Sequence, residues 1–163
     1  MKRWERLKLV EYQKFFSRQP HWVWLTREGI DLIGLPYRVW GANALMLEHI
    51  YWVNQVRFYA QKRHPNAQWT SERDLKYEHE KKGHLPDAEI ETDKGMVAIE
   101  VELTRKKPMR VALIMRNLLA LYRGGTIWYF TTPATEHIVK TALAKFTKEQ
   151  QQQFRIYAVE VTL

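Results

Sequence analysis

The sequence contains no cysteine, which excludes disulfide bonds, iron–sulfur clusters and zinc sites with thiolate ligands. No apolar run is long enough to cross a bilayer, and no signal-peptide core follows the first residues, so we expect a soluble, cytoplasmic protein that does not enter membranes. Neither a Walker A pattern nor GxGxxG occurs, and Gly-x-Ser-x-Gly is missing too. Nucleotide-loop and serine-hydrolase chemistry are therefore without sequence support.

Acidic side chains are in the minority: the 163 residues contain 18 Asp and Glu against 26 Lys and Arg, a formal net charge of +8. Such an excess favours a polyanionic partner, because Lys and Arg on phosphates release condensed counterions, although many basic proteins simply stay soluble this way. Residues 103–123 contain no acidic residue at all. The residues of this segment that we predict to bind DNA are Arg105, Lys106, Lys107, Arg110 and Arg116.

Hydrophobic residues make up 45% of the chain, which indicates a globular protein that we divide into residues 1–40 and a main domain over residues 41–163. In the first part, β-prone runs around residues 7–16 and 21–25 precede a short helix with Thr26 as its N-cap. This arrangement resembles the wing and closing helix of a winged-helix domain, truncated because two preceding helices are missing. A plain hairpin-plus-helix is an equally open interpretation.

The main domain is predicted to alternate helices and strands in the order αβββαβαβ. We expect a helix over 43–63, a β-prone segment over 68–75, a polar loop over 76–83, strands near 85–91 and 96–104, a helix over 108–122, a strand over 126–132, a helix over 136–146 and a strand over 155–162. Helical crossovers after the third and fourth strands imply partly parallel pairing. The fold class is therefore α/β, with a central mixed β-sheet flanked by helices.

Carboxylates are concentrated around the predicted hairpin of this domain. At the two-residue period of a strand, Glu100 and Glu102 share one face of residues 96–104, and the opposite face is apolar. A turn at residues 93–95 would bring Asp87 alongside them. Three clustered carboxylates repel one another unless a cation lies among them, and Mg²⁺ prefers such oxygen ligands. The alternative is that these carboxylates have ordinary structural roles. Half-exposed strands often carry Glu on the solvent-exposed face, and Pro-Asp often opens a turn.

These residues resemble the PD-(D/E)xK nuclease superfamily, with its restriction-endonuclease-like core. Pro86-Asp87 matches the first half of the motif and Glu100-Val-Glu102 the second, with Glu102 where the family usually has Lys. The resemblance implies that Asp87 and Glu100 ligate Mg²⁺ or Mn²⁺. Glu102 would be a further ligand, a holder of water or a general base. Lys106 would replace the usual lysine in space, or the electrostatic role of that lysine would be absent.

More closely, the chain resembles the replication-relaxation family of plasmid and mobile-element proteins over roughly residues 20–130. The matching segments are Trp24-Leu-Thr-Arg-Glu-Gly29, Leu47-Glu-His49, Val53-Asn-Gln-Val-Arg57, Pro86-Asp-Ala88 and Val101-Glu-Leu-Thr-Arg-Lys106. This resemblance implies a role in plasmid replication or transfer.

Four further residues are weighed as additions to the site. Glu48 and Glu72 are possible extra acidic groups, although a solvated surface role is the more common one for such residues. His84 lies three residues before Asp87 and is a possible site residue. We interpret His49, on the long helix, as a packing or capping residue.

The leading hypothesis is a Mg²⁺-dependent DNA endonuclease, or a nuclease module of a mobile-element system. The alternative is a catalytically inactive, nuclease-like DNA-binding protein that assists or regulates plasmid replication or transfer. An interaction scaffold with a basic surface is a third reading, which leaves the paired Glu face unexplained. The oligomeric state stays open, a homodimer included.

Overall fold

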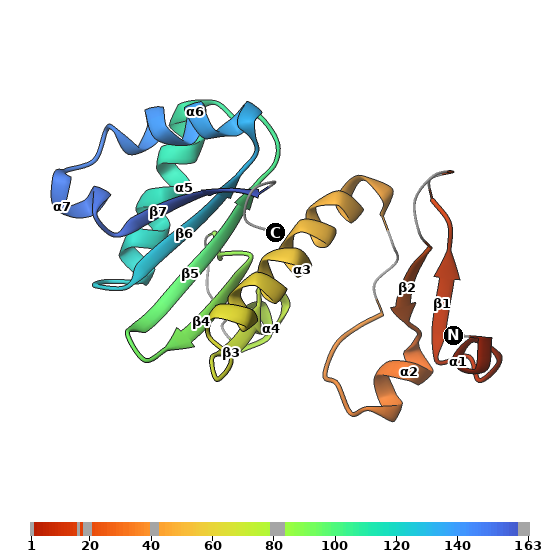
Figure 1. The fold of residues 1–163 in the computed structure, drawn as a ribbon. Coiled ribbons are helices and arrows are strands. Elements are labelled where there is room, and N and C mark those ends of the chain that lie inside the picture. Colours follow the sequence, from red (N-terminus) through yellow and green to blue (C-terminus); the bar gives the residue numbers. More distant parts are fainter. Residues whose placement is uncertain (1, 16, 18–20, 40–42, 79–83, 160–163) are drawn as a thin grey trace. The chain divides into compact units, whose positions relative to one another are not determined.

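The computed structural model describes residues 2–15, 17, 21–39, 43–78 and 84–159 (Figure 1). The chain divides into two compact units, Met1–Glu48 and His49–Leu163, and the boundary falls inside a long helix. No helix within the described ranges combines the length and apolarity needed to span a bilayer.

The first unit contains a two-stranded hairpin followed by a capped helix. Its elements are α1 (Lys2–Arg6), β1 (Val10–Gln13), β2 (Trp22–Leu25) and α2 (Arg27–Leu32). The strands pair antiparallel, and the Thr26 side chain accepts a hydrogen bond from the Gly29 N–H at 3.1 Å, as expected for an N-cap. The strands and α2 were predicted; α1 was not. Residues 18–20 of the predicted connection lie outside the described residues.

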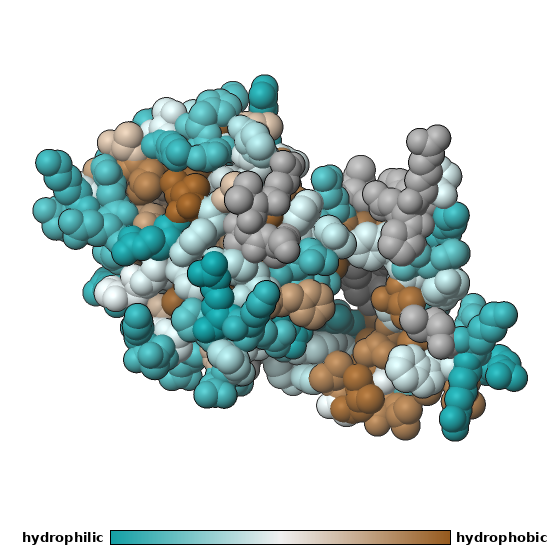
Figure 2. Space-filling view, viewed as in Figure 1, coloured by the Kyte–Doolittle hydropathy of each residue, from teal (hydrophilic) through white to brown (hydrophobic). Residues whose placement is uncertain are grey.

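Gly29 allows α2 to lie close to the backbone that precedes β1. An added Cβ at this position would lie 2.0 Å from the carbonyl oxygen of Leu9, a separation that no side chain tolerates. Figure 2 shows apolar side chains gathered on the visible face of this unit, where Leu32 and Ile33 are among the exposed residues.

The second unit is built on a five-stranded mixed sheet in the order β3-β4-β5-β6-β7. Its elements are α3 (Ala44–Arg63, which begins in the first unit), β3 (Gln68–Ser71), α4 (Glu72–Glu78), β4 (Ala88–Thr92), β5 (Gly95–Glu102), α5 (Pro108–Leu121), β6 (Thr126–Thr131), α6 (Pro133–Leu143), α7 (Lys148–Gln151) and β7 (Phe154–Ala158). Strands β3, β4 and β5 pair antiparallel, whereas β5, β6 and β7 pair parallel. The α/β class and the mixed sheet are confirmed.

The predicted order of elements is wrong at two places, because α4 and α7 are additional helices. The β-prone segment over 68–75 ends as a strand at Ser71, and the predicted polar loop is helical up to Glu78. Both the backbone N–H and the hydroxyl of Ser71 bond the Asp74 carboxylate, and the Asp74 N–H bonds back to the hydroxyl. Helix α7 begins with a capping box between Thr147 and Gln150. Reciprocal caps of this kind satisfy orphan donors and start a helix.

Some predicted boundaries also shift. Strand β4 begins at Ala88, three residues later than expected, and the preceding Pro86 has no N–H to contribute to a ladder. Helix α6 begins at Pro133, three residues before the expected start, behind a Thr132–Thr135 capping box. The predicted last strand is β7, and residues 160–162 lie outside the described residues.

The two faces of the sheet are covered by different helices. Val97, Ile99 and Val101 of β5 pack with Val56 and Ala60 of α3. On the other face, buried side chains of β5 and β6 pack with α5 and α6 (Figure 1); among them are Ala98, Ile127, Tyr129, Val111, Met115 and Val139. The predicted alternation of β5 is therefore correct. The alternative of a half-exposed strand with Glu on its solvent-exposed face is wrong, because helices cover both sides of the sheet and Glu100 is only 3% exposed.

Candidate functional site

Asp87 and Glu100 lie beside each other where β4 begins and β5 approaches its end. Ala88 pairs with Ile99 in the antiparallel ladder, and one further step of this register places Asp87 opposite Glu100. The Val101 N–H donates a 2.7 Å hydrogen bond to Asp87 Oδ2, which fixes the Asp87 carboxylate against β5. The backbone thus orients one acid of the predicted motif against the strand that carries the other two.

His49 joins this arrangement from α3. Its Nε2 lies 2.8 Å from Asp87 Oδ1. The hydrogen bond to Asp87 raises the pKa of His49, and burial opposes that shift. The expectation of a packing or capping residue is therefore wrong: His49 is the partner of the Asp87 carboxylate.

His84 makes the corresponding contact with Glu100. Its Nε2 lies 3.0 Å from both carboxylate oxygens of Glu100. Burial raises the pKa of Glu100 to about 7, the negative charge of Asp87 adds to the shift, and the hydrogen bond to His84 opposes it. The same hydrogen bond raises the pKa of His84. The Glu100–His84 pair therefore retains a proton near neutral pH that the separated groups would lose.

Glu102 pairs with Lys106. The ammonium of Lys106 lies 2.6 Å from Glu102 Oε2, and the Glu102 side chain is only 2% exposed. Thr135 on α6 donates a 2.7 Å hydrogen bond to the Glu102 carbonyl, which ties the end of β5 to the helix layer. Glu102, which shares the face of β5 with Glu100 as predicted, is therefore buried together with it. Lys106 lies four residues beyond Glu102 in the sequence. Its positive charge lowers the pKa values of Glu100, His49 and His84, against the larger influences that raise them.

We call Asp87, Glu100 and Glu102 the carboxylate cluster; its basic partners are His49, His84 and Lys106. Within the part of the chain that the structure describes, no three His, Asp or Glu side chains are placed to hold a metal ion by themselves. Mg²⁺, however, is usually bound by one or two carboxylates together with waters and substrate phosphates. Asp87 and Glu100 supply two such carboxylates, and a cation between them would relieve the repulsion that raises the Glu100 pKa. The donor chemistry therefore fits Mg²⁺ in the presence of a phosphate ligand.

The predicted DNA-binding residues follow directly from the carboxylate cluster along the chain. Arg105 and Lys107 flank Lys106 and are exposed. Arg110 and Arg116 are exposed on α5. Lys106 differs from these four because it is partly buried and already paired with Glu102.

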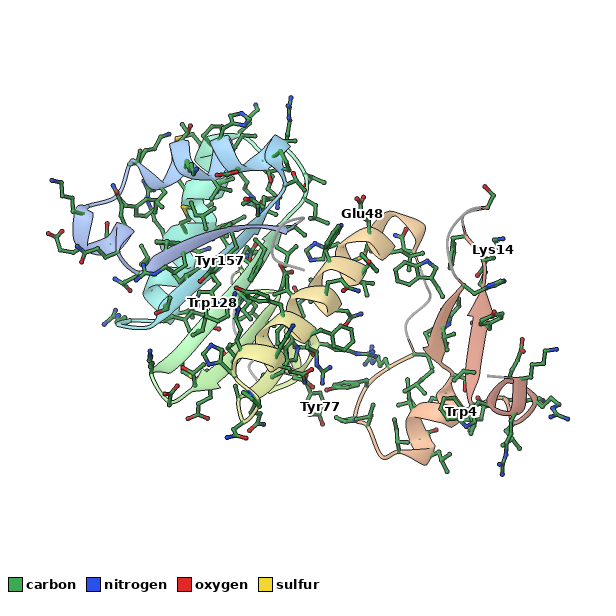
Figure 3. The ribbon with its side chains drawn as sticks, in the orientation of Figure 1. Trp4, Lys14, Glu48, Tyr77, Trp128 and Tyr157 are labelled. Carbon is green, nitrogen blue, oxygen red and sulfur yellow. The ribbon has the colours of Figure 1, made fainter. Side chains whose placement is uncertain are left out.

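The two additional acidic candidates are not joined to the carboxylate cluster by any side-chain contact among the described residues. Glu48 is exposed on α3 (Figure 3). The Glu72 carboxylate pairs with Lys76 at 2.6 Å, one turn along α4. Only the backbone of Glu72 approaches the cluster, since its N–H donates to the Asp87 carbonyl at 2.9 Å.

Tyr129 on β6 is a residue of this region that the sequence did not single out. Its Cα pairs with Glu100 across the parallel β5–β6 ladder, so the two side chains leave the sheet on the same face. Burial raises its pKa well above the usual value, and the charges of Glu100, Glu102 and Asp87 add to this shift. A tyrosine inside an otherwise apolar run was the only available signal.

Comparison with known proteins finds no match, since no family model, no curated protein and no solved structure matches the chain.

Proposed function

We propose that the protein is a Mg²⁺-dependent DNA nuclease, alone or as a module of a plasmid or mobile-element system. One observation carries the proposal: Asp87 lies opposite Glu100 in the β4–β5 register, and Lys106 pairs with Glu102, two residues further along the same strand. Two acids and a lysine are the groups that the PD-(D/E)xK motif brings together. Lys106 supplies the positive charge that Glu102, at the usual lysine position, does not.

Each group has a role that follows from its contacts. Bound Mg²⁺, or Mn²⁺, would polarise the scissile phosphate and lower the pKa of an attacking water. Asp87 and Glu100 would hold the ion, with Asp87 kept in orientation by the Val101 N–H. His49 and His84 hold the same carboxylates in the structure described here, so ion binding exchanges histidine contacts for metal contacts. Lys106 would stabilise the negative charge that develops on the phosphate.

The exposed basic residues would bind the DNA backbone. Two of them, Arg105 and Lys107, lie in the β5–α5 connection. The other two, Arg110 and Arg116, are exposed on α5. Contacts from such residues to phosphates position a duplex but carry no sequence information. We therefore expect binding to DNA of many sequences, with strong salt dependence.

A plasmid-cleavage assay tests this proposal. Supercoiled DNA is incubated with wild type, Asp87→Asn or Glu100→Gln in Mg²⁺, Mn²⁺ or EDTA. We expect nicking by wild type only with a divalent ion, and a loss of roughly a hundredfold or more in either variant, because each removes a charged ligand from the transition state. Glu91→Gln is the matched control, since Glu91 is exposed on β4. Equal cleavage by Glu100→Gln and wild type would refute catalysis at this cluster.

The second candidate is a catalytically inactive DNA-binding protein that assists or regulates plasmid replication or transfer. The observation in its favour is that each carboxylate of the cluster already has a basic partner within the chain, either a histidine or Lys106. This candidate predicts DNA binding in EDTA and no cleavage under any condition.

Fluorescence anisotropy of a labelled duplex over a range of salt concentrations tests the binding surface. The double variant Lys107→Ala/Arg110→Ala should weaken binding to all sequences similarly and reduce the slope of log affinity against log salt by about 2, since each phosphate contact contributes about 0.9. Lys94→Ala, in the exposed β4–β5 turn, is the control. Wild-type binding that does not change with salt contradicts both candidates.

A further inference from the structure

The hydroxyl of Tyr129 is a buried polar group that the fold does not satisfy. Tyr129 has no exposed surface, and its hydroxyl has no hydrogen-bond partner among the described residues. A buried hydroxyl that loses its bonds to water without replacing them destabilises the folded state, so native proteins keep few such groups. An unsatisfied buried hydroxyl of this kind points to another state of the site, in which the hydroxyl has a hydrogen-bond partner.

The position of Tyr129 directs the hydroxyl to the carboxylate cluster. Strands β5 and β6 run parallel, and Glu100 is the residue directly across from Tyr129 in the register. Both side chains therefore leave the sheet on the face that α5 and α6 cover. Burial raises the pKa of the Tyr129 phenol, and the negative charges of all three carboxylates of the cluster add to this shift.

In the structure described here, the carboxylates of Glu100 and Glu102 are bonded by other donors and not by Tyr129. Both Oε atoms of Glu100 face His84 Nε2 at 3.0 Å. Glu102 Oε2 faces the Lys106 ammonium at 2.6 Å. The hydroxyl can therefore gain a partner if the Glu100 carboxylate changes its orientation, because each carboxylate oxygen accepts more than one hydrogen bond.

We propose that Tyr129 is a positioning residue for Glu100: its hydroxyl donates a hydrogen bond to the Glu100 carboxylate once that carboxylate binds a divalent cation. This inference rests on the proposed function, because it assigns a role within the same site. The hydrogen bond orients one Oε toward the cation by holding the other. No covalent or proton-transfer step is involved, and Tyr129 itself does not touch DNA.

The test is Tyr129→Phe, which removes the hydroxyl and keeps the ring in the core. Urea unfolding of wild type and variant is followed by circular dichroism, first in EDTA and then over a series of Mn²⁺ concentrations. The dependence of stability on Mn²⁺ gives an apparent dissociation constant without any activity measurement. Tyr157→Phe, on β7 and on the opposite face of the sheet, is the matched control.

In EDTA we expect Tyr129→Phe to be as stable as wild type or more stable, because the unpartnered hydroxyl is gone. The apparent Mn²⁺ dissociation constant should rise roughly tenfold or more, the usual consequence of losing a hydrogen bond to a charged group. Tyr157→Phe should leave this constant unchanged. Because Tyr129 acts through Glu100, Tyr129→Phe should have no further effect on Mn²⁺ binding in a Glu100→Gln background.

Three results would overturn the inference, and they are distinguishable. A Tyr129→Phe variant that is less stable in EDTA shows that the hydroxyl supports the fold itself. An unchanged Mn²⁺ constant in the variant, with wild type stabilised by Mn²⁺, removes the role of Tyr129 and leaves the proposed function standing. Wild type that neither cleaves DNA nor gains stability with Mn²⁺ removes the proposed function and this inference with it.

Discussion

The buried Glu100 carboxyl makes the stability of the chain depend on pH, and Glu100→Gln should remove that dependence. The pKa of Glu100 rises from 4.5 to about 7 on folding, mainly because of burial. The folded chain therefore binds this proton more tightly than the unfolded chain does. The resulting stability is complete below about pH 4.5 and is lost as the pH rises through about 7.

The magnitude follows from the size of the shift. One pKa unit corresponds to about 1.36 kcal/mol, so the rise from 4.5 to about 7 at a side chain only 4% exposed is worth about 3 kcal/mol of unfolding free energy. The raised pKa of His84 acts in the same direction, since its stabilisation is present below about pH 6.5 and is lost at higher pH. Glu100→Gln removes the carboxylate contact that raises the His84 pKa, so both contributions decrease together.

The assay is urea unfolding at intervals from pH 5 to 8.5 in EDTA, followed by circular dichroism. Wild type should lose at least about 2 kcal/mol over this interval relative to Glu100→Gln, because the contribution is already slightly reduced at pH 5. The control Glu91→Gln changes an exposed carboxylate on β4 and should follow wild type. Parallel curves for wild type and Glu100→Gln would show that ionisation of Glu100 is not coupled to folding, and the reasoning would be refuted.

Three further substitutions test other parts of the structure. Lys106→Met leaves Glu102 buried without its cation and should lower the unfolding free energy by roughly 3 kcal/mol at pH 8. Adding Glu102→Gln should restore the stability, and a Lys106→Met variant as stable as wild type contradicts this prediction. Ser71→Ala removes the cap of α4 and should cost roughly 1 kcal/mol in thermal unfolding, and an unchanged midpoint argues against the cap. Gly29→Ala forces a Cβ against Leu9 and should increase hydrogen exchange within the first unit; unaltered exchange would mean that α2 shifts freely.

Elements with a strong local signal could be predicted from the sequence. The period-two pattern of β5 identified the two faces of the strand, and Thr26 and Pro108 marked the starts of α2 and α5. The missed helices α4 and α7 are short and polar, so no apolar stripe reveals them. Their capping boxes were the available signal.

The candidate site could be predicted only where its residues are close in sequence. Asp87, Glu100 and Glu102 belong to one hairpin, whose turn and alternation determine their relative placement. His49 is 38 residues from Asp87, and their contact depends on how α3 packs against the sheet. The burial of Glu100 and the neighbourhood of Tyr129 depend on α5, α6 and β6, which no local pattern around residue 100 indicates.

The position of the carboxylates along the chain also affects the order of folding. The β4–β5 hairpin is a local structure, closed by a two-residue connection between the paired Thr92 and Gly95. Strand β6 and helices α5 and α6, which cover the face of the sheet that carries Glu100, follow the hairpin in the sequence. While the hairpin stands alone, both acids remain hydrated, and dehydration begins only when the C-terminal half docks. Alkaline pH should therefore slow this docking step while leaving hairpin closure unaffected, because the ionised groups resist burial against the elements that follow the hairpin in the chain.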